Sequence, residues 1–252
     1  MGKPFSQEDC ITHLKSLVNI NSGSCNPTGL DQCASYIKKL WEPLTSSCNE
    51  IKDPQNNLIA LVFKKNPQAA KQCLLNIHVD TVFEQTHSFQ SFIQLTNDTA
   101  TGPGVIDAKG GIIILLRTLH LLEASDLATK IGWTVIISTD EETGSQHSKT
   151  ILQQEAKNKD FAFVFEPPLE NGNIITERPA SANITIEATG TAAHAGRYPD
   201  KGKNAILALI ETLNKLNSFL TPAYSDSHTV NVGTIEGGTR ENIVPDHASC
   251  TL

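Results

Sequence analysis

The spacing of hydrophobic residues predicts alternating helices and buried strands over the first two thirds of the chain. Apolar positions recur at helical intervals in residues 7–20 and 31–40, which predicts two opening helices. Further helical patterns cover residues 109–122 and 146–155. Short apolar runs bounded by polar turns are typical of strands buried on both faces, and they cover residues 58–63, 73–79, 133–138 and 161–165. This order predicts an α/β fold, a mixed sheet covered by helices.

The pattern changes near residue 180. Residues 182–188 alternate apolar and polar side chains, which indicates a strand with one face in water. A helix is expected over 204–216, an extended segment over 229–235, and a last strand from about His247. We therefore expect a larger domain over residues 1–179 and a smaller α+β domain over residues 180–252.

Charge and hydropathy exclude several classes of partner. The 252 residues include 20 Lys and Arg against 27 Asp and Glu, a net charge of -7. Such a chain repels phosphate backbones and anionic lipid surfaces, so we expect neither nucleic acid nor membrane as a partner. No stretch approaches the roughly 20 apolar residues that a membrane span needs. The first ten residues contain no apolar segment typical of a secretion signal, which predicts a cytoplasmic protein.

The first candidate for chemistry is the pair His78 and Asp80, at the end of a predicted buried strand. In an extended chain, residues two apart project to the same side. Asp80 could therefore hold the ring of His78 while the other ring nitrogen binds a metal ion. The plainer interpretation of a His-x-Asp sequence is a hydrogen-bonded pair without a catalytic role.

Three further candidate segments contain acidic residues that follow turns or strands. Asp107 follows a Gly-Pro-Gly turn and precedes a helix, where it would either cap that helix or bridge two metal ions. Glu141 and Glu142 come directly after a buried strand. They would either form part of a solvated loop or point in opposite directions, one toward a metal ion and one toward a proton. Glu166 ends an apolar strand and needs a partner if it is buried.

Most of these candidates fall at predicted carboxyl ends of strands, where open α/β sheets place their binding sites. One histidine with several carboxylates forms a set of divalent-metal ligands, and nitrogen with oxygen donors suits zinc. The combination is more specific than any of its members, and it predicts a metal centre.

In this pattern the chain resembles the zinc-dependent exopeptidases and N-acyl amino acid deacylases, a family that includes glutamate carboxypeptidase, acetylornithine deacetylase and succinyl-diaminopimelate desuccinylase. The resemblance covers essentially the whole chain, with the motifs in order at familiar spacing. The segments 78–83 and 139–145, with Glu166 as the third carboxylate, look closest to the glutamate carboxypeptidase branch.

The resemblance implies a metal centre with two zinc ions, for which cobalt could substitute. His78 and Glu166 would hold one zinc ion, Asp107 would bridge the two, and Glu142 would help to hold the second. Two cations lower the pKa of a bridging water and polarise the scissile carbonyl.

The same resemblance assigns roles to the neighbouring residues. Glu141 would be the general base that takes a proton from the bridging water, and Asp80 would orient His78. A cis peptide bond is expected between Asp107 and Ala108.

The smaller domain looks like the lid and dimerisation domain of this family. By the resemblance, His194 would reach the site of a neighbouring subunit and stabilise the oxyanion, while Asn242 would contact the substrate. A homodimer through this domain is implied. Without the resemblance, His194 would be interpreted as a loop histidine with no chemical role.

The implied activity is hydrolysis of the amide bond next to a C-terminal amino acid, with a small peptide or an N-acyl amino acid as substrate. Two alternatives stay open. The first is an N-acetyl or N-succinyl amino acid deacylase, and the second is a truncated, inactive member that acts only in binding. Family members continue past the position of Leu252 and supply a late zinc-ligating His and a substrate-binding Arg, so we expect the lid domain to be incomplete here.

Overall fold

The computed structural model describes residues 5–178, 180–220 and 229–252. The chain divides into two compact units, Met1–Asn173 and Ile174–Leu252. The predicted boundary at residue 180 falls between β7 and β8, where the described residues of 165–184 form no helix or strand.

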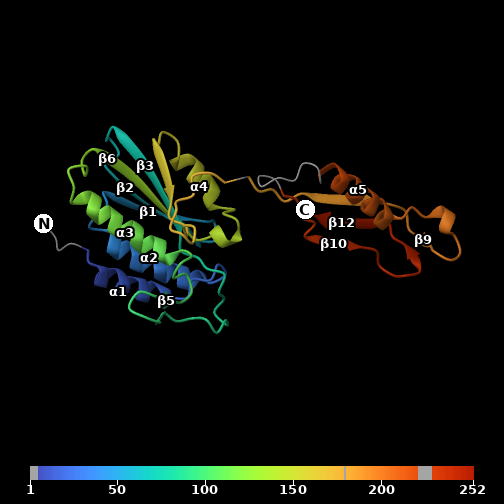
Figure 1. Cartoon of the computed structure of the whole chain (residues 1–252), viewed down its shortest axis with the longest axis horizontal. Helices are drawn as coiled ribbons and strands as arrows, with labels where there is room; N and C mark the ends of the chain where they lie inside the picture. The colour runs from blue at the N-terminus through green and yellow to red at the C-terminus, as the bar shows by residue number, and fades with distance from the viewer. Residues whose placement is uncertain (1–4, 179, 221–228) are drawn as a thin grey trace. The chain divides into compact units, whose positions relative to one another are not determined.

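The first unit is built on a five-stranded mixed sheet (Figure 1). Its strand order is β1-β2-β6-β3-β7. The strands are β1 (Ser47–Lys52), β2 (Leu58–Lys65), β6 (Ile131–Ser138), β3 (Lys71–His78) and β7 (Phe161–Val164). The strands β1, β2 and β6 pair antiparallel, whereas β3 runs parallel to both β6 and β7. The carboxyl ends of β6, β3 and β7 therefore lie at one edge of the sheet.

Helices cover both faces of this sheet. On one face, α1 (Gln7–Val18), α2 (Pro27–Trp41) and α3 (Lys109–Glu123) share a hydrophobic core with alternate residues of β2, β3 and β6. On the other face, Ile151 of α4 (Ser148–Glu155) packs against the intervening residues of the same strands. The continuous apolar runs of these strands are thus explained by burial on both sides. In the described part of the chain, no helix is both long and apolar enough to cross a bilayer.

Two helix starts differ from the predicted positions because polar side chains cap them. The helix α2 begins at Pro27, since the side chain of Asn26 accepts from the amide of Gly29 and proline suits the first helical position. The helix α4 begins at Ser148, two residues later than expected, and Asp140 accepts from its first amides.

The connections of the first unit contain two short elements. The strands β4 (Ile93–Gln94) and β5 (Ala100–Thr101) form a small hairpin, and the 3-10 turn η1 (Glu141–Thr143) follows β6.

The second unit is a three-stranded antiparallel sheet packed on one helix (Figure 1). The sheet has the order β10-β12-β8. The elements of this layer are β8 (Thr185–Thr189), β10 (Thr234–Gly237), β12 (His247–Thr251) and α5 (Ala205–Leu220). Ala205 and Leu209 of α5 pack on Ala248 and Cys250 of β12.

A small ribbon and a turn complete the second unit. The ribbon joins β9 (Ala193–His194) to β11 (Ile243–Val244), and the 3-10 turn η2 (Pro199–Lys201) precedes α5. The extended segment expected over 229–235 becomes a strand only from Thr234, because the register of β10 on β12 begins at the pair Thr234 and Thr251.

Candidate metal centre

Three of the predicted ligands meet at the carboxyl edge of the parallel strands. His78 is the last residue of β3, Glu166 lies two residues beyond β7, and Asp107 lies two residues before α3. One ligand atom from each of these side chains lies within 4.8 Å of the other two. A turn before a helix and two adjacent strand ends thus bring together residues that are far apart in the sequence.

His78 is the centre of this cluster. Its ring is fully buried, and Nε2 lies 3.0 Å from Oδ1 of Asp107, 3.5 Å from Oε1 of Glu166 and 3.9 Å from Oε2 of Glu141. The carboxylates are more open, since the side chains of Asp107 and Glu141 are 52% and 46% exposed. A buried imidazole nitrogen therefore faces solvent-accessible carboxylate oxygens, and all of them can serve as metal ligands.

Asp80 holds the other side of the imidazole and also the acidic turn η1. Its Oδ1 lies 3.2 Å from Nδ1 of His78, and its carbonyl oxygen lies 3.1 Å from the same ring atom. The amide of Glu141 donates to Oδ1 at 3.2 Å, and the amide of Glu142 donates to Oδ2 at 3.1 Å. Ser24 donates to Oδ2 through its hydroxyl at 3.1 Å. One fully buried carboxylate thus fixes the histidine and both glutamates at once.

The carboxylates change the proton affinity of the whole cluster. Burial lowers the pKa of His78, but hydrogen bonds and charges from Asp80 and Glu166 outweigh burial and raise it to about 11. Burial raises the pKa of Glu141 and of Glu142, and the nearby carboxylates raise both further against the opposing effect of His78. The imidazole of His78 therefore lies among more carboxylates than its own positive charge can balance.

The donor set fits a divalent metal ion. One imidazole nitrogen and two carboxylate oxygens are ligands that zinc accepts. Because Nδ1 of His78 donates to Oδ1 of Asp80, Nε2 is left as the nitrogen that can bind a metal ion beside Asp107 and Glu166. Glu142 is not among the residues that converge within the cluster in the described part of the chain. The peptide bond between Asp107 and Ala108 is cis, as the resemblance predicts.

The remaining two predicted site residues lie in the second unit and close to each other. His194 in β9 pairs in register with Ile243 of β11, and the amide of Ala195 donates to the carbonyl oxygen of Asn242 at 3.0 Å. The side chain of His194 is exposed, and its Nδ1 accepts from the amide of Gly196 at 3.2 Å. The ribbon thus presents His194 and Asn242 from one small region of this unit.

Lys109 is a buried cation that sequence reasoning placed only as a helical residue. It is fully buried, and its Nζ donates to the carbonyl oxygens of Leu17 at 3.0 Å and Ile20 at 2.8 Å. Burial lowers the pKa of its ammonium group. By bonding to the carboxyl end of α1, Lys109 anchors the start of α3, next to Asp107. Its position two residues after Asp107 was the signal that the sequence offered.

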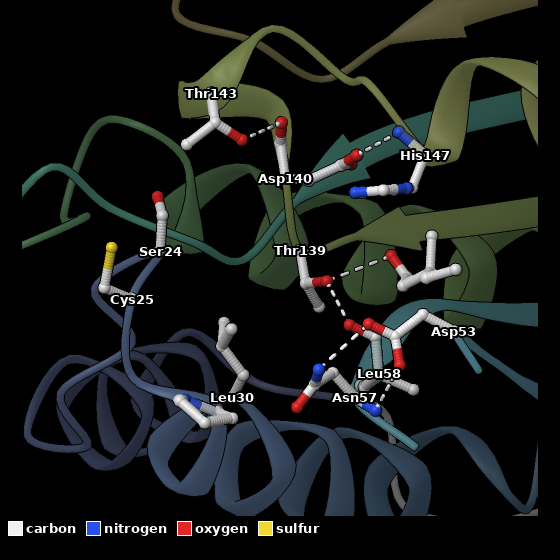
Figure 2. A pocket seen from close by; sticks show the side chains of 12 residues that line it. Ser24, Cys25, Leu30, Asp53, Asn57, Leu58, Thr139, Asp140, Thr143 and His147 are labelled. Atoms are coloured by element: carbon white, nitrogen blue, oxygen red, sulfur yellow. Dashed lines mark hydrogen bonds between the residues drawn. The ribbon is translucent and has the colours of Figure 1, made fainter. Parts of the chain in front are cut away.

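A cavity of about 300 Å³ lies next to the metal centre, and none of the eight predicted site residues lines it. Figure 2 shows Ser24 and Cys25 on one side of it, and Asp140, His147 and Asp53 on the other. Ser24 also bonds to Asp80, so the cavity and the metal centre share a wall.

Comparisons with known proteins identify the same group that the motifs indicate. Residues 176–252 match the model of the peptidase dimerisation domain of the M20 peptidases. The chain is 30% identical over 251 residues to Carboxypeptidase G2 from a Pseudomonas species, covering 98% of this chain and 59% of that protein. It is 27% identical to a probable carboxypeptidase from Aspergillus niger, covering 93% of this chain and 60% of that protein. The chain thus spans about 60% of the length of these relatives.

Solved structures share the fold. Aminopeptidase PepT from Bacillus cereus superposes with a TM-score of 0.66 at 19% identity, covering 98% of this chain and 65% of that structure. The M20 family metallo-carboxypeptidase Sso-CP2 from Sulfolobus solfataricus gives 0.62 at 15% identity, covering 96% of this chain and 70% of that structure. The predicted resemblance and the predicted α/β fold class are both confirmed.

Proposed function

We propose that this chain, a relative of the M20 metallopeptidases, forms the metal-binding and lid portions of a hydrolase that cleaves the amide bond of a C-terminal amino acid. The observation that carries the proposal is the convergence of His78, Asp107 and Glu166 within 4.8 Å, with Glu141 at 3.9 Å from the same imidazole. A carboxypeptidase name recurs among the relatives, which supports a peptidase over other hydrolases.

In the proposed reaction, residues of this chain would hold two zinc ions, and one residue would transfer a proton from the attacking water to the leaving amine. His78 and Glu166 would hold one ion, Asp107 would be shared by the two, and Glu142 would help to hold the second. Metal ions held there would polarise the scissile carbonyl and lower the pKa of the attacking water. Glu141 accepts the proton of that water and returns it to the leaving amine, so no net proton is consumed at this carboxylate.

The second unit supplies the remaining proposed roles. We propose that residues 176–252 pair two copies of the protein, and that His194 stabilises the oxyanion in a neighbouring subunit while Asn242 contacts the substrate. The match of this segment to a dimerisation domain supports the pairing. Sedimentation equilibrium of the purified protein tests it, and a monomer at all concentrations would contradict it.

The test of the activity is a substrate panel with zinc or cobalt added to the metal-stripped protein. The panel contains N-acyl glutamates, dipeptides, and N-acetyl and N-succinyl amino acids. We expect metal-dependent release of a C-terminal amino acid. Preference for N-acetyl or N-succinyl compounds would indicate a deacylase, and metal binding without any turnover would indicate a protein that acts only in binding.

Two variants show whether the turnover comes from this site. Glu141→Gln removes the proposed base but keeps the size of the side chain, so we expect kcat to fall by about 10²–10⁴-fold with metal content unchanged. Glu170→Gln is the matched control, because Glu170 is exposed and lies outside the metal centre. Equal activity of Glu141→Gln and the native chain would contradict the assignment.

A further inference from the structure

The acidic turn that carries Glu141 and Glu142 is held from two sides. On the side of the metal centre, Asp80 accepts from both glutamate amides. The side chains of the two glutamates make no hydrogen bond to other described residues that would orient them independently of the backbone. Their carboxylates are therefore placed mainly by the backbone of the turn.

On the other side, Asp140 closes the turn with its carbonyl group. This oxygen accepts from the amide of Ser145 at 2.8 Å and from the hydroxyl of Thr143 at 3.0 Å. Gly144 lies between these two residues in the left-handed region at φ 88°, and its amide donates to the carbonyl oxygen of Glu141 at 2.8 Å. The backbone of residues 140–145 is thus folded around the carbonyl of one residue.

The carboxylate of Asp140 attaches this turn to α4. Its Oδ2 accepts from the amide of His147 at 2.8 Å and from the amide of Ser148 at 3.1 Å, at the positive end of the helix. Asp140 is only 8% exposed, and Oδ1 has no hydrogen-bond partner among the described residues. Figure 2 shows the carboxylate over the ring of His147 and the carbonyl turned toward Thr143. A single buried oxygen therefore connects the turn to a rigid helix.

We infer that Asp140 is a positioning residue: by fixing the turn to the amino end of α4, it sets where the carboxylates of Glu141 and Glu142 stand relative to His78. This inference rests on the proposed function for its catalytic consequence. Its structural part is that the amides of Glu141 and Glu142 are placed against Asp80, and this part depends only on the hydrogen bonds described above.

The test compares Asp140→Ala with Asp140→Asn. Alanine removes the acceptor, so we expect weaker binding of the second metal ion, an unchanged first ion, and a kcat lower by roughly 10- to 100-fold with KM unchanged. Asparagine keeps an oxygen that can accept from both amides of α4, so we expect it to restore most of the lost kcat. A purely structural role would lower the fraction of folded protein and leave the kcat of that fraction unchanged.

Asp53→Ala is the matched control. Asp53 lines the same cavity, but its carboxylate accepts from the amide of Asn57 at 2.8 Å and from the side chain of Asn57 at 2.9 Å, and not from residues of the turn. We expect this variant to keep the native metal isotherm and kcat. Equal losses in Asp53→Ala and Asp140→Ala would overturn the inference, because they would trace the effect to the cavity and not to the turn.

Amide hydrogen exchange separates failure of this inference from failure of the proposed function. We expect Asp140→Ala to speed exchange at Glu141 and Glu142 in metal-free protein, while Asp53→Ala leaves it unchanged. If the native chain binds no metal and hydrolyses nothing, the proposed function fails, yet the exchange result still decides the positioning role. Unchanged exchange in Asp140→Ala would overturn the inference regardless of activity.

Discussion

Gly111 lies where the first turn of α3 meets the end of β7, and its replacement by alanine tests how closely these elements hold the metal centre together. An added Cβ would stand 2.2 Å from the carbonyl oxygen of Phe165 and 2.8 Å from Cδ1 of Ile77. Neither group moves away easily, because the amide of Phe165 is bonded to Asn76 at 2.9 Å and Ile77 is fully buried. Since ordinary contact begins at 3.4 Å, the helix and the strand end must separate by about 1 Å.

Two opposing effects set the change in the free energy of unfolding. Overpacking a close-packed interior costs about 1–3 kcal/mol. Alanine in a helix gains about 1 kcal/mol over glycine. Because the overlap involves a backbone carbonyl and not a flexible side chain, we place the cost in the upper half of its range. The expected net loss is about 1–2 kcal/mol, or roughly 3–6 °C in Tm for a unit of this size.

Urea unfolding followed by tryptophan fluorescence measures this loss directly, because both tryptophans, Trp41 and Trp133, are buried in the core of the first unit. Thr118→Ala is the control for helix propensity, since Thr118 is exposed in the same helix, and we expect it to change stability by less than about 0.5 kcal/mol. A Gly111→Ala chain as stable as the native one, or more stable, would refute the reasoning. The displaced residue after Phe165 is Glu166, so we also expect weaker metal binding.

Two other predictions concern buried charges. Lys109→Met removes the ammonium donor from the carbonyl oxygens of Leu17 and Ile20, although that of Leu17 still accepts from the amide of Ile20. We expect the free energy of unfolding to fall by about 1–3 kcal/mol in the same urea assay; no loss would show that the cost of burying the ammonium equals the gain from its hydrogen bonds. Because the pKa of His78 is raised from 6.5 to about 11 in the metal-free fold, its protonation stabilises that fold fully below pH 6.5, and we expect this contribution to vanish as the pH rises toward 11. Metal must displace the same proton, so calorimetry in buffers of different ionisation enthalpy should show an affinity that rises with pH and release of about one proton per chain; binding independent of pH would contradict this.

The sequence pattern predicts those strands whose side chains are buried on both faces. The strands β2, β3 and β6 contain continuous apolar runs, and the pattern places them within two residues of their observed ends. The edge strand β1 escaped prediction because five of its six side chains are exposed, so only its backbone pairing with β2 makes it a strand. Residues 229–233 show the reverse case: Thr229, Val230 and Val232 favour a strand, but the pairing of β10 with β12 starts at Thr234.

The sequence predicts a site residue where the position of that residue at the end of a strand is enough to place its side chain in the site. His78 and Glu166 were expected together because the ends of parallel strands share one edge. The bonds from the amides of Glu141 and Glu142 to Asp80 were not predictable, since they join segments 61 and 62 residues apart through backbone donors that every residue possesses. The burial of Lys109 was hidden for a different reason, because lysine is almost never fully buried without a carboxylate partner.

The charge balance of the cluster gives the strongest physical reason to expect a cation there. Carboxylate oxygens of Asp80, Asp107, Glu141 and Glu166 lie within 3.9 Å of one imidazole, and Glu142 follows Glu141 in the same turn. Asp80 is satisfied by backbone amides, a hydroxyl and the imidazole. Asp107 and Glu166 raise the pKa of Glu141, and Asp107 and Glu141 raise the pKa of Glu142, which is the response of like charges without a counter-ion. A divalent cation among these carboxylates would replace their mutual repulsion by attraction to the ion. Its binding would also stabilise the folded state by mass action. The solvent-accessible carboxylates around His78 are therefore the ligands that a metal site needs, whereas a purely structural hydrogen-bond network would gain nothing from their repulsion.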